Sequence, residues 1–174
     1  MFGKPNMKRH WKKKYNEGFS GHEPDSTDIE NELRAALTKG TVLEIGAGAG
    51  HFTKLLKEWG YEVTATDLVV GTQLDITKER LGNFDNVIAM GVLHHILDHE
   101  KLLAALNNIK AMAKKRIIIG VKLPSQRLRT KTRHSYRYSV LDYIEVFGNP
   151  VTVTACGYLS LLEWNLEAMS RPDS

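Results

Sequence analysis

The sequence predicts an α/β protein with a mostly parallel central sheet, for three reasons. Stretches rich in β-branched residues alternate with stretches whose apolar residues recur at helical spacing. The stretch RIIIGV (116–121) is apolar enough to be buried on both faces, as the central strands of parallel sheets are. Two strand-like stretches near the C-terminus meet around Gly157, which indicates a hairpin. We therefore expect helices on both faces of a sheet that ends in a C-terminal β-hairpin.

The strands are expected, in chain order, at 41–46, 61–67, 72–76, 84–92, 116–121, 151–155 and 158–166. Helices are expected at 26–40, 51–60, 99–115 and 139–148. In the first of these, Thr27 as N-cap and Glu30 form a capping-box pattern, and Gly40 marks the end. Asp98 and Ser139 are the expected caps of the last two helices.

The length of 174 residues and the composition are typical of one soluble domain. Hydrophobic residues make up 42% and charged residues 25% of the chain. There is no run of about 18 apolar residues, as a membrane span needs, and no apolar segment follows the basic N-terminus as in a secretory signal. The single cysteine, Cys156, excludes an internal disulfide framework and suits a reducing compartment. We expect a cytoplasmic protein that does not enter a membrane.

The net charge of +4 conceals two strongly basic segments. Residues 1–14 contain six Lys and Arg, residues 101–141 contain eleven, and neither segment contains Asp or Glu. One interpretation is a solvated helix face with a charged tail, which suits the lysines of 101–115. The other is an anionic partner, and the choice depends on where these segments lie in the fold.

Gly46, Gly48 and Gly50 lie between the first expected strand and the helix that follows it. Glycine lets the backbone approach a ligand closely, and the N–H groups of a helix N-terminus suit a carboxylate or phosphate. Asp67 ends the next strand, 21 residues after Gly46, where a carboxylate can accept hydrogen bonds from ribose hydroxyls. Because His51 replaces the third small residue of the dinucleotide fingerprint, the pattern indicates another nucleoside cofactor.

The pattern E-x-G-x-G-x-G from Glu44 to Gly50 resembles that of the class I S-adenosylmethionine-dependent methyltransferases. Four further blocks fit this family in the same order, namely TATDL, LDI, FDNVIAMGVLHHI and RIIIGV. The match extends from about Thr41 to Val121, and its VLHHI block is most similar to a branch with many small-molecule methyltransferases. The resemblance implies a Rossmann-like sheet, S-adenosylmethionine as the cofactor, and a single methyltransferase domain over 1–174.

The resemblance also implies which residues meet the methionine and ribose parts of the cofactor. Gly46, Ala47 and Gly48 would let the backbone approach the methionine moiety, and Glu44 would brace this turn from the strand. Asp67 would hold the ribose.

On the adenine side, the resemblance implies contacts from Leu68, Asp75 and Ile76, while Met90 would line the floor beneath the sulfonium. Asp75 also suits an ordinary turn at a strand end. The chain departs from the family here, because LVVGTQL is too short for the helix usually found between the second and third strands. We therefore expect a trimmed fold with a thin wall around the adenine.

His94 and His95 follow the fourth expected strand, beside the position that the transferable methyl group would face. A histidine there suits removal of a proton from a hydroxyl or amine, since its pKa lies near neutrality. We expect His94 rather than His95 to be this base; alternatively, one or both histidines only pack against the turn or hydrogen-bond to it. A zinc site is not expected, because the chain has no second cysteine and no HExxH motif.

In the family, the chain before the first helix often covers the cofactor, and the chain after the fifth strand often frames the substrate entrance. The two basic segments occupy these places, so we expect a lid at 1–25 and a substrate-side loop at 122–138. Guanidinium groups suit two-point contacts with phosphate or carboxylate, and aromatic rings offer stacking surface. The candidate substrate-binding residues of the loop are Arg127, Arg129, Arg133, His134 and Tyr136.

Together these features predict methyl transfer to an oxygen or nitrogen of an anionic small molecule, phosphorylated or nucleotide-linked. Two alternatives stay open: an RNA or DNA methyltransferase, and a non-catalytic cofactor-binding module of the same fold. The N/D-P-P-Y stretch typical of amino-methylation on bases does not follow the fourth strand. No oligomeric state is predicted.

Overall fold

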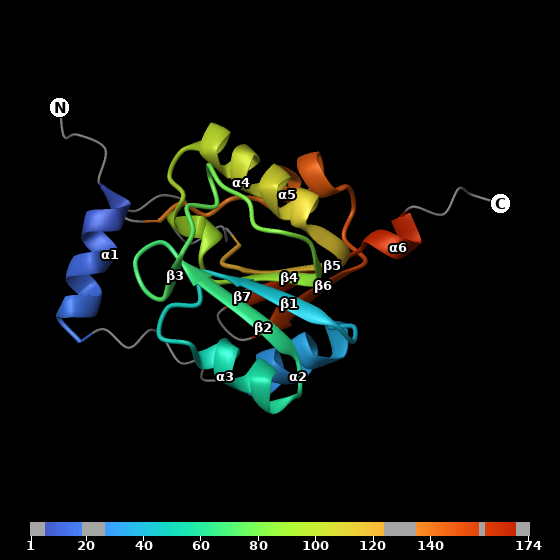
Figure 1. Ribbon diagram of the computed structural model, residues 1–174. Coiled ribbons are helices and arrows are strands. Elements are labelled where there is room, and N and C mark those ends of the chain that lie inside the picture. The colour runs from blue at the N-terminus through green and yellow to red at the C-terminus, as the bar shows by residue number, and fades with distance from the viewer. Residues whose placement is uncertain (1–5, 19–26, 124–134, 157–158, 170–174) are drawn as a thin grey trace.

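Figure 1 shows the computed structural model of the chain, which describes residues 6–18, 27–123, 135–156 and 159–169. Within these ranges the strands form one sheet in the order β3-β2-β1-β4-β5-β7-β6. The strands are β1 (Thr41–Ile45), β2 (Glu62–Asp67), β3 (Thr72–Gln73), β4 (Phe84–Met90), β5 (Ala113–Val121), β6 (Thr152–Cys156) and β7 (Leu159–Asn165). Neighbours from β3 to β5 are parallel, whereas β7 is antiparallel to both β5 and β6. The predicted parallel sheet with a C-terminal hairpin is therefore confirmed.

Helices cover both faces of this sheet, as predicted. They are α1 (Met7–Asn16), α2 (Thr27–Ala36), α3 (His51–Glu58), α4 (His99–Met112), α5 (Val140–Phe147) and α6 (Leu166–Met169), with a short 3₁₀ turn, η1 (Leu93–His95). Figure 1 shows α4 and α5 on one side of the sheet and α2 and α3 on the other. Each side has its own apolar core, because α4 and α5 pack into one buried cluster and α2 and α3 into the other.

The middle of β5 shows how the sheet separates these two cores. Ile117 and Ile118 are consecutive and both fully buried, yet they belong to opposite clusters. Successive side chains of a strand point to opposite faces, so an unbroken apolar run fills both cores. The expectation of burial on both faces is confirmed for residues 117–121, whereas Arg116 is half-buried.

Several local predictions differ from the structure. Helix α2 begins at Thr27 itself, so Thr27 is not the cap. Helix α4 ends at Met112 and β5 begins at Ala113, three residues earlier than expected, because Ala113 pairs with Phe84 at the start of β4. Alanine and lysine favour a helix by propensity, and pairing in the sheet overrides that preference.

The connection between β2 and β3 is short, as expected from the sequence. Only four residues, 68–71, separate the two strands, and β3 itself has only two. The chain leaves the sheet after Gln73 because Asp75 starts a turn, in which its carbonyl accepts hydrogen bonds from Lys78 N and Glu79 N. Leu74 and Ile76 enter the core instead of continuing the expected strand to residue 76.

Two predicted helix caps are confirmed. The side chain of Asp98 accepts a hydrogen bond from Lys101 N at the start of α4. At the start of α5, Ser139 and Asp142 form a capping box, in which Ser139 N donates to the Asp142 carboxylate at 2.6 Å. Each cap fixes the first turn of a helix, and with it the direction in which the chain leaves the preceding loop.

Candidate active site

The turn after β1 depends on glycine for its backbone shape. Gly46 and Gly48 have φ angles of 73° and 56°, in the left-handed region that side chains rarely adopt. A Cβ on Gly46 would also lie only 2.4 Å from Val92 Cγ2, next to η1. The N–H groups of Gly46 and Ala47 both donate to the carbonyl of Thr66, at 2.8 and 2.9 Å. The turn is thereby held against the carboxyl end of β2.

Asp67 is fixed where β2 ends, directly beside this turn. One carboxylate oxygen accepts a hydrogen bond from Gly48 N at 3.2 Å, and the other accepts one from Val69 N at 3.0 Å. Each carboxylate oxygen can accept about two hydrogen bonds, so both oxygens retain a lone pair for further donors. The side chain is half-buried, and it joins the glycine turn to the short connection that precedes β3.

Glu44 lies beneath the same turn and is almost completely buried, with 2% of its surface exposed. Its carboxylate accepts a hydrogen bond from the Thr53 hydroxyl, so it ties β1 to α3 and braces the turn between them. Burial raises the pKa of Glu44 to about 7, with the negative charge of Asp67 adding to the rise and the Thr53 hydrogen bond opposing it. Glu44 therefore exchanges a proton close to neutral pH.

Asp75 and Ile76, which were expected to lie around an adenine, already have partners within the protein. One Asp75 oxygen accepts hydrogen bonds from both the N–H and the hydroxyl of Thr77, and the other pairs with Lys78 Nζ at 2.7 Å. Burial alone would raise the pKa of Asp75, and these partners lower it instead. Asp75 thus organises its own turn. Ile76 is buried in the core on the α4 side, and its carbonyl accepts a hydrogen bond from Asn108 Nδ2.

Leu68 and Met90 lie at the carboxyl ends of β2 and β4, the two strands that flank β1. Leu68 is half-buried and directly follows Asp67. Met90 ends β4 and is 9% exposed, and a Cβ built on Gly120 of β5 would come within 2.8 Å of its methyl carbon. Gly120 therefore makes room for the Met90 side chain across the sheet.

His94 and His95 form part of η1, immediately after β4, and they have different surroundings. His94 is 6% exposed, and its Nδ1 has no hydrogen-bond partner among the described residues. Burial, together with the nearby His95, Lys122 and Arg137, lowers the pKa of His94 to about 3. The expectation of a pKa near neutrality is wrong for His94, because the protein buries this ring beside positive charge. His95 is half-buried, and its ring centroid lies 4.1 Å from that of His94.

Helix α1 was not among the helices expected from the sequence. It reaches β3, the histidine turn after β4 and the glycine turn after β1. Figure 1 shows it beside the sheet rather than packed on either face. Lys8 Nζ donates to the Gln73 side chain of β3 at 3.2 Å. The Trp11 ring meets the His95 ring at 4.8 Å in an edge-to-face contact. The Tyr15 hydroxyl lies 3.0 Å from where a Cβ on Gly48 would be.

The Tyr15 hydroxyl also lies within the electrostatic reach of Asp67. Burial, followed by the negative charge of Asp67, raises the pKa of the Tyr15 hydroxyl to about 12. The hydroxyl therefore stays protonated at physiological pH and acts as a hydrogen-bond donor. Helix α1 thus spans the carboxyl ends of the strands from β3 to the turn after β4.

Comparison with known proteins agrees with this geometry. Residues 23–147 match the sequence pattern of a methyltransferase-domain family. The chain belongs to the class I S-adenosylmethionine-dependent methyltransferases. It is also 30% identical over 114 residues to an uncharacterized methyltransferase of Staphylococcus carnosus (strain TM300). That match covers 52% of this chain and 54% of the other, so the chain spans about half the length of this curated relative.

Solved structures show the same fold. The 1,6-didemethyltoxoflavin-N1-methyltransferase of Burkholderia thailandensis, with 1,6-didemethyltoxoflavin and S-adenosylhomocysteine bound, superimposes with a TM-score of 0.71 at 19% identity, covering 91% of this chain and 86% of that one. The magnesium protoporphyrin IX methyltransferase of Synechocystis PCC 6803 with bound S-adenosylhomocysteine gives 0.64 at 18% identity, covering 95% and 90%. The predicted Rossmann-like methyltransferase fold is confirmed.

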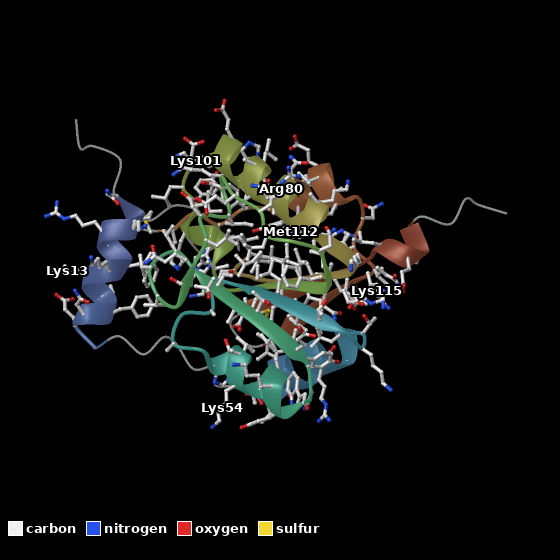
Figure 2. All side chains as sticks on the ribbon, viewed as in Figure 1. Lys13, Lys54, Arg80, Lys101, Met112 and Lys115 are labelled. Atoms are coloured by element: carbon white, nitrogen blue, oxygen red, sulfur yellow. The ribbon has the colours of Figure 1, made fainter. Side chains whose placement is uncertain are left out.

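Two lysines of the basic segment 101–115 contact other groups of the protein. Lys110 Nζ donates to the Val146 carbonyl at 2.7 Å, and Lys115 pairs with Asp85 at 3.1 Å. Figure 2 shows Lys115 at the end of the molecule away from α1 and Lys13 on α1 itself. These contacts of Lys110 and Lys115 fit the interpretation that the lysines of 101–115 are part of a solvated helix and strand surface.

Residues 135–138, which precede α5, lie beside the histidine turn after β4. Tyr136 N donates to the His94 carbonyl at 2.7 Å, and the Tyr136 ring packs 4.6 Å from the Tyr138 ring. Arg137, between them, is one of the positive charges that act on His94. The other expected substrate residues, Arg127, Arg129, Arg133 and His134, lie outside the described residues.

Sequence reasoning missed Trp11 and Tyr15, although a signal was present. The two rings are four residues apart, so a helix presents them on one face, in contact with each other at 6.2 Å. Asn6 caps this helix by accepting a hydrogen bond from Arg9 N. The pattern N-x-x-x-x-W-x-x-x-Y is compatible with a short capped helix that has an aromatic side.

None of the helices in the described ranges combines the length and the apolar character that crossing a lipid bilayer requires. No cluster of three or more His, Cys, Asp or Glu side chains in these ranges is arranged to hold a metal ion.

Proposed function

We propose that this methyltransferase domain transfers the methyl group of S-adenosylmethionine to an oxygen or nitrogen of an anionic small molecule. The observation that carries the proposal is the meeting of three elements at one edge of the sheet: the glycine turn after β1, Asp67 at the end of β2, and the histidine turn after β4. Parallel sheets bind ligands at this edge. Family membership and the likeness to methyltransferase structures with bound S-adenosylhomocysteine support the same interpretation.

The residues at this edge fit a nucleoside with a methionine tail. Asp67 has lone pairs left for two ribose hydroxyls, after its hydrogen bonds from Gly48 and Val69. Gly48 has no Cβ, and the Tyr15 hydroxyl lies 3.0 Å from where one would be, so this glycine lets α1 come close to the turn. Glu44 supports the turn from below. Asp75 is bound within its own turn, so we assign it a structural role rather than an adenine contact.

S-adenosylmethionine supplies a methyl group on a positively charged sulfur, which is displaced in line by the acceptor. The protein must hold the acceptor in line, keep water out and take up the acceptor's proton. In our proposal, α1 covers the site, with Tyr15 above the glycine turn and Trp11 against His95. This assigns the predicted lid to Met7–Asn16 within the expected segment 1–25.

We assign the role of general base, which takes up the acceptor's proton, to His95 rather than to His94. The prediction of His94 as the base depended on a pKa near neutrality, whereas burial lowers the pKa of this ring to about 3 and makes it a weak base. His95 is half-buried and contacts the lid through Trp11. His94 then serves as a positioning residue, packed 4.1 Å from the base.

The anionic nature of the substrate is inferred from charge at the same edge. Lys122 and Arg137 both act electrostatically on His94, so they bring positive charge to the histidine turn. The sequence adds Arg127, Arg129 and Arg133 in the segment between them. The solved relatives act on small molecules, 1,6-didemethyltoxoflavin and magnesium protoporphyrin IX, which supports a small acceptor here.

Methyl-labelled S-adenosylmethionine tests the proposal without knowledge of the substrate. We expect the purified protein to transfer label from this cofactor into a small-molecule fraction of cell extract that binds an anion exchanger. Label in RNA or DNA would support the nucleic-acid alternative instead. No transfer, with cofactor binding retained, would favour a non-catalytic module.

A triple variant tests the basic loop in the same assay. Changing Arg127, Arg129 and Arg133 to Gln is expected to raise the substrate KM while leaving affinity for S-adenosylhomocysteine unchanged, because each guanidinium–anion contact is a charge-assisted hydrogen bond. Lys54→Gln on the exposed face of α3 is the matched control, since it also removes positive charge. Wild-type KM in the triple variant would show that these arginines do not bind the substrate.

A further inference from the structure

We infer that the basic side of α1, formed by Arg9, Lys12 and Lys13, binds the phosphate backbone of a nucleic-acid strand. This goes beyond the proposed function, because it concerns a surface of the helix and does not depend on which acceptor is methylated. The inference starts from the charges of α1, which carries most of the positive charge of the basic N-terminal segment 1–14.

Helix α1 presents different side chains on two of its sides. On one side, Trp11 meets the histidine turn after β4 and Tyr15 lies over the glycine turn after β1. Residues three and four positions apart share a side of a helix, so Arg9, Lys12 and Lys13 lie together on another side. All three are exposed, and α1 stands beside the sheet rather than on either of its faces (Figure 1). The basic side is therefore open to a large partner.

The charges on the basic side are not neutralised by the protein. Among the described residues, no carboxylate pairs with Arg9 or Lys12. Lys13 reaches Glu17 at 3.6 Å, but the two side chains are 76% and 55% exposed, and such pairs hold their partners weakly. Lys115 of β5, by contrast, is only half-buried and has a carboxylate at 3.1 Å. The basic side thus has positive charge to offer to an anion.

The same charges are not arranged to stabilise the helix. The first turn of α1 has no acidic residue, which would suit the helix dipole, and contains Lys8 and Arg9 instead. Lys8 lies four residues before Lys12, and Arg9 lies four residues before Lys13, so like charges repel along the helix surface. Helix α2 has the favourable arrangement, with acids in its first turn and an arginine in its last. Bound phosphates would relieve the repulsion in α1.

Two features of α1 favour a nucleic acid over a lipid surface. A helix that lies on a membrane inserts its apolar side among the lipids, whereas Trp11 and Tyr15 of α1 meet the turns of the protein itself. Arg9 and Lys13 are separated by about 6 Å along the helix axis, and the phosphates of one duplex strand follow each other every 3.4 Å or so. The basic side therefore spans about two neighbouring phosphates, which guanidinium and ammonium groups bind by charge-assisted hydrogen bonds.

Fluorescence anisotropy with a labelled RNA of mixed sequence, about 20 nucleotides long, tests the inference on the full chain. We expect the wild type to bind this RNA with an affinity that falls as salt rises from about 50 to 200 mM. On a double-logarithmic plot, each phosphate contact with a single strand contributes a slope of about −0.7.

A triple variant assigns the binding to the basic side. Changing Arg9, Lys12 and Lys13 to Gln should weaken binding at least about tenfold and make the salt slope shallower by about 2, the value of three lost contacts. Glutamine favours a helix and removes the repulsion, so α1 should persist in this variant. Arg9→Lys with Lys12→Arg and Lys13→Arg keeps the charges and should retain most of the affinity.

A second triple variant controls for net charge. It removes three positive charges from exposed positions on α3 and at the start of β5, by changing Lys54, Lys57 and Lys114 to Gln. We expect it to bind RNA nearly as the wild type does. Equal thermal unfolding midpoints verify that the variants are folded.

Three results would overturn the inference. The first is no binding of RNA by the wild type, and the second is equal weakening in the two Gln variants. The third is binding to vesicles that contain phosphatidylglycerol without binding to RNA, which would assign the basic side to a lipid surface. Failure of the proposed function is distinguishable, because it would appear as no methyl transfer or no binding of S-adenosylhomocysteine, whatever the RNA affinity.

Discussion

Replacing His95 with alanine is expected to lower kcat by about 10²–10⁴-fold, the usual contribution of a general base. The acceptor must lose a proton as its new bond to carbon forms, and His95 is the half-buried histidine at the turn that Trp11 and α1 cover. Affinity for S-adenosylhomocysteine should remain unchanged, because the proposed cofactor-binding groups lie elsewhere: the glycine turn follows β1 and Asp67 ends β2, whereas His95 follows β4. Single-turnover kinetics with the labelled cofactor measure the effect.

The pH–rate profile separates a base from a purely structural residue. A histidine base must be neutral to accept a proton, so the wild-type rate should fall on the acid side, and His95→Ala should remove this limb. His94→Ala is the matched control and should lower kcat much less, because burial keeps the His94 ring neutral and weakly basic. A larger loss in His94→Ala than in His95→Ala would return the role of base to His94.

Glu44→Gln is expected to stabilise the free protein by about 3 kcal/mol at pH 8 and by very little at pH 4.5. Burial raises the pKa of Glu44 from 4.5 to about 7 in the folded state, and a tenfold change in proton affinity corresponds to about 1.4 kcal/mol. Below pH 4.5 the group is neutral in both states, and above pH 7 it is charged in both. The stability of the wild type relative to the variant therefore falls as the pH rises from 4.5 to 7.

Urea unfolding of the two proteins at several pH values measures this difference. His94 acts in the opposite sense, because its pKa falls from 6.5 to about 3 on folding and its contribution is lost as the pH drops below 6.5. His94 is present in both proteins, so its effect cancels in the comparison. Glu62→Gln, an exposed carboxylate on β2, is the control. A difference between wild type and Glu44→Gln that is the same at pH 4.5 and pH 8 would contradict the assignment.

The sequence predicted the geometry of the glycine turn and Asp67 because the signals for these features are local. Gly46 and Gly48 require a turn with positive φ, and Asp67 ends the strand that pairs with β1 in parallel register. Parallel strands bring their carboxyl ends to the same edge, so two short patterns are enough to place the turn beside the carboxylate. The hydrogen bond from Gly48 N to Asp67 agrees with that reasoning.

The acceptor side was harder to predict because it depends on burial and on distant segments. The dipeptide His94-His95 does not indicate which ring points into the protein, and the 3₁₀ turn buries only the first. Trp11 becomes part of the proposed site only because α1 lies across the strand ends, some eighty residues from His95 along the chain. The adenine contact expected of Asp75 was difficult to predict for a different reason. Thr77 and Lys78, in the same turn, already pair with this carboxylate.

Asp67 and the glycine turn carry the central claim, namely that this edge of the sheet binds S-adenosylmethionine. Calorimetric titration with S-adenosylhomocysteine tests it, comparing the wild type with Asp67→Ala. We expect the wild type to bind this ligand and to show no measurable affinity for NAD, and we expect Asp67→Ala to lose about 1–3 kcal/mol of binding free energy, the cost of unmade hydrogen bonds to a charged group. Equal affinity in the wild type and Asp67→Ala, or binding of NAD, would contradict the claim.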